Sequence, residues 1–120
     1  MRDSLIYATD GRQLVTLAVL LIIPVAHSHH SDAPHFYMDQ NVLHEGVVTD
    51  FKFVNPHAYV YFNETNEGGL LESWRCELPA ALTLRRLGWT EDSLRSGQPL
   101  SVQASPARRE DNHCYVNAFV

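Results

Sequence analysis

Most of the chain after residue 40 follows the two-residue period of β-strands. Residues 42–54 are rich in Val and Phe without helical spacing, and Gly46 stands where a long strand would bend or bulge. Residues 57–63 alternate between two faces, an inward one with Ala58, Val60 and Phe62 and an outward one with His57, Tyr59 and Tyr61. The pattern predicts two consecutive strands that meet at a corner, Asn55 and Pro56.

A third strand is predicted over residues 70–78, after a turn rich in Asn, Glu and Gly. Its inward face carries Leu70, Trp74, Cys76 and Leu78, and its outward face carries Ser73, Arg75 and Glu77. This strand and the one before it should form a hairpin, which brings Arg75 or Glu77 across from His57.

One short helix is predicted over residues 80–87, because Pro79 suits a first helical position and Gly88 suits a helix end. Leu82, Leu84 and Leu87 can form its apolar side. Thr90, followed by acidic residues, has the pattern of a second helix start. Two more strands are predicted over 100–104 and 114–120, the last with one face made of Cys114, Val116, Ala118 and Val120.

Three strands, a helix and two strands are the order of a small barrel that binds oligonucleotides or oligosaccharides, the OB-fold. We therefore expect an all-β fold with one short helix, arranged as a five-stranded OB-like barrel. The alternative is an open antiparallel sheet capped by the helix. In the barrel the third and fifth strands are neighbours, which favours a disulfide between Cys76 and Cys114 over two separate buried thiols.

The first quarter of the chain differs from the rest. Residues 14–26 form a short apolar run preceded by Arg12, which is the pattern of a secretory signal peptide. We expect residues 1–28 to be a signal peptide cleaved near Ser28, residues 29–40 an extended His-rich arm, and residues 41–120 the barrel. This predicts a periplasmic protein without stable membrane insertion after processing; an uncleaved anchor is the alternative.

The formal net charge of the chain is −5 at pH 7. The predicted signal peptide contains equal numbers of acidic and basic residues, so cleavage leaves this charge unchanged. Such a chain should repel nucleic acid.

Histidines gather around the predicted cleavage point. A new amino terminus at His29 would place an α-amine and an imidazole on one Cu(II) or Ni(II) ion, and His30 could complete a nitrogen-rich site. We predict that His57 and Glu77 contribute from the barrel if the arm folds back. The alternative is a solvated arm that binds metal adventitiously. His44 and His113 have the pattern of single surface histidines.

A second hypothesis assigns the outward face of the second and third strands to ligand or partner binding. Tyr59, Tyr61 and Arg75 lie on this face, where such barrels commonly bind ligands; a solvated sheet face is the alternative. We expect no enzymatic activity, because the sequence contains no nucleophile triad, phosphate loop or carboxylate pair that could be assigned a reaction.

Several segments together resemble a family of small exported bacterial proteins that is described only as a domain of unknown function. They are residues 29–31 (HHS), 46–48 (GVV), 55–58 (NPHA), 74–77 (WRCE), 86–90 (RLGWT), 92–94 (DSL) and Gly97. The resemblance implies a periplasmic single domain with no assigned reaction and no catalytic residues. Cys76 and Cys114 depart from the family pattern, and the resemblance leads us to expect a last strand that continues beyond Val120.

Overall fold

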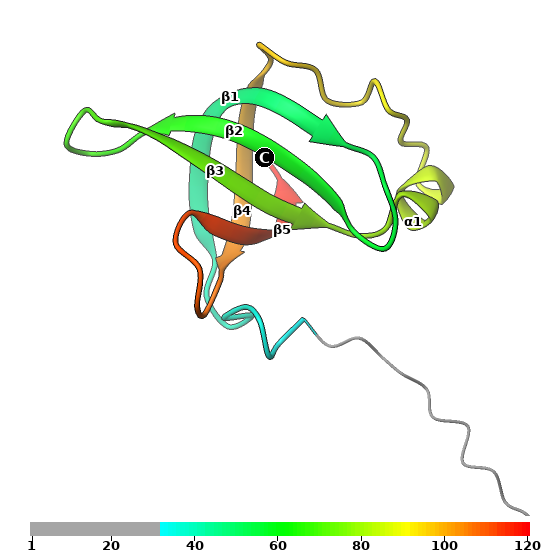
Figure 1. Cartoon of the computed structure of the whole chain (residues 1–120), viewed down its shortest axis with the longest axis horizontal. Helices are drawn as coiled ribbons and strands as arrows, with labels where there is room; N and C mark the ends of the chain where they lie inside the picture. Colours follow the sequence, from blue (N-terminus) through cyan, green and yellow to red (C-terminus); the bar gives the residue numbers. More distant parts are fainter. Residues whose placement is uncertain (1–31) are drawn as a thin grey trace, which may run out of the picture.

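The computed structural model describes residues 32–120, which form a closed barrel of five strands with one short helix (Figure 1). The elements are β1 (Val42–Lys52), β2 (Ala58–Thr65), β3 (Leu71–Leu78), α1 (Ala81–Arg86), β4 (Pro99–Pro106) and β5 (His113–Phe119). Around the barrel the strand order is β1-β2-β3-β5-β4. The predicted fold class, mostly β with a single helix in a small OB-like barrel, is confirmed, and the open sheet is not formed.

Strand β1 is long and curved, so that it pairs with two neighbours. Its second half, from Gly46 to Lys52, is antiparallel to β2, whereas its first half, from Val42 to Val47, is antiparallel to β4. The change of partner occurs at Gly46, where a Cβ atom would overlap the carbonyl oxygen of Asn63. Glycine is therefore required for the close approach of the two backbones at this bend.

The corner between β1 and β2 holds the helix in place. The side-chain oxygen of Asn55 accepts a hydrogen bond of 3.1 Å from the backbone N–H of Leu82, and the carbonyl of Val54 accepts one of 3.1 Å from Ala81. These two bonds satisfy amides of the first helical turn, which have no partner inside a helix. The corner is therefore a capping device for α1.

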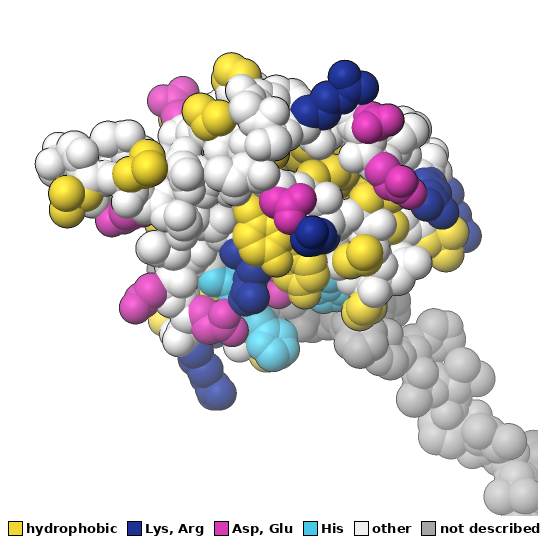
Figure 2. Space-filling model, turned by 45° about the horizontal axis from the view of Figure 1, so that its top comes forward, with side chains coloured by type: hydrophobic (Ala, Val, Ile, Leu, Met, Phe, Trp, Pro, Cys, Tyr) yellow, Lys and Arg dark blue, Asp and Glu magenta, His cyan; other side chains and the backbone are white. Residues whose placement is uncertain are grey.

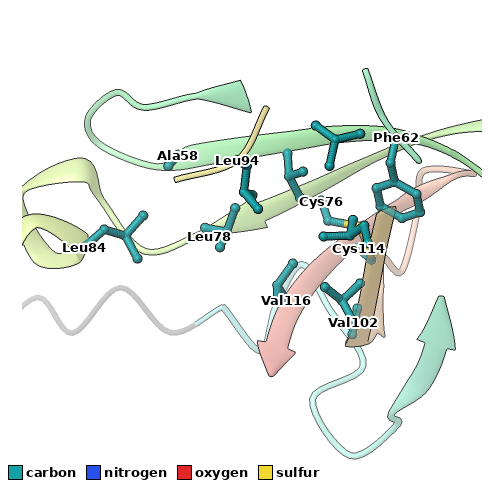
Figure 3. Close-up of a cluster of buried hydrophobic side chains, with 13 residues drawn as sticks. Ala58, Phe62, Cys76, Leu78, Leu84, Leu94, Val102, Cys114 and Val116 are labelled. Carbon is teal, nitrogen blue, oxygen red and sulfur yellow. A yellow bond between two sulfur atoms is a disulfide. The ribbon is translucent and has the colours of Figure 1, made fainter. Parts of the chain in front are cut away.

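Closure of the barrel depends on β5. It runs antiparallel to β4 and parallel to β3, and the β3–β5 ladder pairs Arg75 with His113, Cys76 with Cys114 and Glu77 with Tyr115. A disulfide joins Cys76 and Cys114 inside the barrel (Figure 3).

The core fills the barrel and extends to the helix (Figure 3). It consists of buried side chains from all five strands, α1 and the segment before β4: Val48, Ala58, Val60, Phe62, Cys76, Leu78, Leu84, Leu94, Leu100, Val102, Ala104, Cys114 and Val116. The inward face predicted for residues 57–63 is confirmed, since Ala58, Val60 and Phe62 are fully buried.

Three leucines predicted to be inward lie at the surface. Leu70 belongs to the β2–β3 turn and is 69% exposed. The helix has only six residues, and its buried side chains are Ala81 and Leu84. Leu82 and Leu87 are therefore exposed, because a helix this short buries a single i, i+3 pair. The turn that follows Thr90 is not helical, although the Thr90 hydroxyl accepts a hydrogen bond from the N–H of Asp92.

The end of β5 also differs from the predicted alternation. Cys114 and Val116 are buried as expected, but Ala118 and Val120 are exposed. The register with β4 shifts between Gln103, which pairs with Ala118, and Ala104, which pairs with Val116. Asn117 therefore has no partner residue on β4 and forms a bulge. A bulge of this kind reverses which residues point inward beyond it.

Residues 32–41 pack against the barrel beside the β4–β5 turn. Phe36 pairs with Ala107 in an isolated bridge and is 2% exposed, with its ring against the rings of His113 and Tyr115 at centroid distances of 5.2 and 5.7 Å. The backbone of Arg108 donates to the carbonyl of His35, and its guanidinium donates to Ala33 and Phe36. Within residues 32–120, no helix is long and apolar enough to cross a membrane.

Candidate functional site

Two histidines and one carboxylate meet on the outer side of β3. The Nδ1 atom of His57, the residue before β2, lies 2.5 Å from Oε2 of Glu77, and Nε2 of His113 lies 3.2 Å from Oε1 of the same carboxylate. Glu77 comes from β3 and His113 from the first position of β5. A single carboxylate therefore lies between two imidazoles from different strands.

The contact with Glu77 orients the His57 ring. Because an ionised carboxylate only accepts, Nδ1 of His57 donates to Glu77, and in the neutral imidazole the lone pair is on Nε2. Among residues 32–120, Nε2 of His57 makes no hydrogen bond, and the side chain is 32% exposed. His57 thus presents a metal-binding or proton-accepting nitrogen whose orientation is held by Glu77.

His113 is connected to a second charged pair. Its Nδ1 atom accepts from the guanidinium of Arg75 at 3.3 Å, and the same guanidinium nitrogen donates to Glu110 at 2.8 Å. Nδ1 also lies 3.3 Å from Oε2 of Glu110, and Nε2 faces Glu77 without the alignment of a full hydrogen bond. A chain of contacts thus runs from Glu110 through Arg75, His113 and Glu77 to His57.

Burial and charge keep His113 neutral. Burial lowers the pKa of His113, and the neighbouring Arg75 lowers it further, although Glu110 and Glu77 oppose this effect. The ring is buried at 7% exposure against Phe36. His113 therefore serves this site as a neutral hydrogen-bonding group.

Two tyrosines border the cluster. Burial raises the pKa of Tyr115, and the carboxylates of Asp32 and Glu77 raise it further. Burial likewise raises the pKa of Tyr59; Glu77 adds to this shift and Arg75 opposes it. Both hydroxyls are thus protonated donors at neutral pH. The carboxylate of Asp32, the first described residue of the arm, acts on the same Tyr115 hydroxyl as the carboxylate of Glu77.

A hollow of about 450 Å³ lies between the arm and this cluster. Its lining comes from the arm, β3, β5 and the β4–β5 turn: Pro34, His35, Glu77, Ala107, Arg109, Glu110 and His113. Figure 2 shows histidine side chains among acidic and basic ones on the lower part of the visible face. The arm therefore forms one wall of the candidate site.

The structure brings together only some of the predicted site residues. His57 contacts Glu77 as expected for the outward face, whereas His29 and His30 lie outside the described residues. Tyr59 and Arg75 are adjacent, with the guanidinium 5.8 Å from the ring centroid, and Tyr61 pairs with Arg75 across β2 and β3. Within residues 32–120, no group of three or more His, Cys, Asp or Glu is arranged to hold a metal ion.

Sequence reasoning missed two buried histidines. His113 and His44 have the pattern of surface residues, yet they are 7% and 4% exposed. Nδ1 of His44 donates to Glu64 at 2.8 Å, and its ring lies 4.3 Å from that of Trp74. The position of His113 could have been predicted from Cys114, the next residue. A disulfide between Cys114 and Cys76 places the start of β5 beside Glu77, which follows Cys76 in the sequence.

Comparison with known proteins gives one match, to a protein-family model. No curated protein and no solved structure matched the chain. The model of DUF6152, described as a family of unknown function, matches residues 18–115, which is most of the chain and all of the barrel up to the first half of β5. The chain therefore belongs to the DUF6152 family of unknown function.

Proposed function

We propose that this protein is exported to the periplasm, is cleaved near Ser28, and binds one Cu(II) ion, or Ni(II) in its place, through its new amino terminus and His57. The ligands are the α-amine and imidazole of His29, the imidazole of His30 and Nε2 of His57. These nitrogen donors suit Cu(II) and Ni(II), which favour square-planar or tetragonal coordination.

The observation that carries the proposal is the contact between His57 and Glu77. A carboxylate on Nδ1 directs the Nε2 lone pair outward and increases its basicity, the usual arrangement around a metal-bound histidine. Both oxygens of Glu77 face imidazoles, so we assign Glu77 the role of positioning His57 and not of binding metal.

The position of the arm supports the participation of the terminal histidines. Residues 32–36 are held to the barrel by Phe36 and by the hydrogen bonds of Arg108. His30 is two residues before Asp32, and chain geometry limits its Cα atom to roughly 7 Å from that of Asp32. Asp32 and Glu77 both raise the pKa of Tyr115, so the anchored start of the described arm and the carboxylate that contacts His57 act on the same hydroxyl, which supports the proposal that His29 and His30 reach His57.

A titration of the exported, processed protein with Cu(II) tests this function. We expect one ion per chain, a nitrogen-rich spin-resonance spectrum, and much weaker binding after removal of His29 and His30. His57→Gln should lose one nitrogen donor from the spectrum. Glu77→Gln should retain the donor set but weaken binding by roughly 10- to 100-fold, the usual effect of removing the partner of a metal-bound histidine.

His35→Gln is the matched control, because His35 lines the hollow but is not a proposed ligand. It should leave the affinity and the spectrum unchanged. If the wild-type protein and His57→Gln bind Cu(II) with equal stoichiometry and affinity, the barrel is not part of the site. If all variants bind several ions per chain weakly, the arm binds metal only adventitiously.

A second candidate function is non-enzymatic binding of a small ligand or a periplasmic protein at the face of Tyr59, Tyr61 and Arg75. It is supported by the pre-positioned guanidinium beside the Tyr59 ring. However, Arg75 also binds Glu110 and His113, which reduces its capacity for a ligand. Recovery of a specific partner from periplasmic extract by the protein, lost in Tyr61→Ser but not in His57→Gln, would favour this function.

A further inference from the structure

A groove opens on the barrel where β1 leaves β2, away from the site of His57. The ladder between β1 and β2 ends at the pair Gly46 and Glu64, whereas β1 continues to Val42 along β4 and the β2–β3 hairpin continues to the pair Thr65 and Leu71. The two strands thus diverge, and the hollow between them measures about 540 Å³. Figure 1 shows the hairpin projecting from the barrel on the left.

The diverging strands leave backbone groups without a neighbouring strand. Among the described residues, the amide of Glu45 donates to a side chain, Oε1 of Glu64 at 3.0 Å, in place of a strand carbonyl. The β2-facing edge of β1 before Gly46 therefore has no partner strand in residues 32–120. An edge of this kind can take an additional extended segment.

The rim of the groove carries three exposed aliphatic side chains. Leu43 is 52% exposed, Val47 46% and Leu71 68%, and all three line the hollow. They come from alternate positions of β1 and from the start of β3, so they face the same opening. Exposed aliphatic side chains gathered around a hollow are typical of a docking surface.

The charge around the groove is of one sign. Residues 41–48 and 63–73 form the two sides and the hairpin, and they contain four acidic side chains, Glu45, Glu64, Glu67 and Glu72, with no Lys or Arg. Glu45 and Glu64 line the hollow itself. Figure 2 shows hydrophobic and acidic side chains, without basic ones, on the visible face of the hairpin at the left.

We propose that this groove binds an extended polypeptide segment of a partner protein whose outward-facing side chains, at every second position, are in turn aliphatic and cationic. The backbone of the segment pairs with the β1 edge, the outward aliphatic side chains pack between Leu43, Val47 and Leu71, and an outward Lys or Arg lies opposite Glu45, which shares the outward face of β1. Charge complementarity selects this occupant over an acidic or neutral one. The proposal is independent of metal binding at His57.

A short synthetic peptide in which Leu and Lys take turns at every second position, with Thr between them, serves as the probe, and the same peptide with Glu in place of Lys is its control. Binding to the full processed chain is followed by amide NMR signals and by the fluorescence of Trp74 in a Trp89→Phe background, since the chain has two tryptophans. We expect shifts at Leu43, Val47 and Leu71, and an affinity that falls as salt is raised.

Leu43→Ser with Glu45→Lys should weaken binding of the cationic peptide by at least roughly ten-fold, equivalent to about 1.4 kcal/mol. Leu87→Ser with Glu91→Lys makes the same exchange at exposed positions beside the helix and should have no effect. Equal binding of both peptides, or shifts confined to other surfaces, would overturn the proposal.

Two other occupants give distinct outcomes, and each would also overturn it. A groove filled by the chain's own first residues would show the same shifts when the unprocessed chain is compared with the processed one. A groove filled by a second copy would show concentration-dependent shifts and sedimentation without any peptide.

Discussion

Cys76 and Cys114 lie opposite each other in the parallel ladder of β3 and β5 and are joined by a disulfide. Their sequence neighbours are residues of the candidate site: Glu77 follows the first cysteine, and His113 precedes the second. The covalent bond fixes the register that pairs Arg75 with His113 and brings Glu77 to the same ring. One cross-link thus joins two core residues whose neighbours in the sequence form the candidate site.

Replacing both cysteines with Ala should destabilise the barrel. The cross-linked residues are 38 apart in sequence, a loop for which the chain-entropy model gives a loss of about 3–4 kcal/mol. Urea unfolding of the double variant checks this value, and the reduced wild-type protein should unfold at a similar midpoint. An unchanged midpoint would show that the strand contacts alone hold β5 in place.

The anchor of the arm can be tested separately. Phe36→Ala removes a buried ring that packs on His113 and Tyr115, and it should reduce the free energy of unfolding by about 3–5 kcal/mol. Met38→Ala, two residues away and 43% exposed, should change it by less than about 0.5 kcal/mol. If both variants unfold like the wild type, the arm does not contribute to the stability of the barrel.

His113 makes stability depend on pH in a defined direction. Burial holds the folded pKa of His113 below the ordinary histidine value of about 6.5, so the unfolded chain takes up the proton first as the pH falls. The stabilisation is complete above about pH 6.5 and is lost as the pH falls through the folded pKa. His113→Gln should flatten this part of the stability profile, and an NMR titration of the His113 ring with a midpoint above 6.5 would contradict the assignment.

The bend of β1 predicts a sharp difference between two glycines. Gly46→Ala forces a Cβ atom onto the backbone of Asn63, which must shift, at a cost of about 1–3 kcal/mol. Gly68→Ala in the hairpin turn meets only the side-chain oxygen of Asn66, at 3.3 Å, and should be nearly neutral. Thermal unfolding of the two variants distinguishes these outcomes; equal melting temperatures would mean that β1 adapts without strain.

The barrel followed from the sequence because its signals are local. Alternation in residues 57–63 gives the buried Ala58, Val60 and Phe62, and the order of elements gives the topology. The errors arise where local pattern and tertiary packing diverge. Leu82 and Leu87 match a helical stripe, but six helical residues bury only Ala81 and Leu84.

The candidate site was predicted only in part for the same reason. The outward position of His57 and its meeting with Glu77 follow from strand alternation and hairpin pairing. The participation of His113 requires the parallel register of β3 and β5, which no local pattern encodes. The burial of His44 depends on the ring of Trp74, which comes from a strand far along the chain. The sequence around His44 therefore contains no local pattern that predicts its burial.

The β3–β5 ladder contains only three residue pairs and is the shortest in the barrel. A ladder with few contacts is where strands open most readily during brief local openings. Here the middle pair of that ladder is joined by a covalent bond, so Cys76 and Cys114 stay together while the disulfide is intact. The amide protons beside it are therefore expected to exchange with solvent only when the whole domain unfolds.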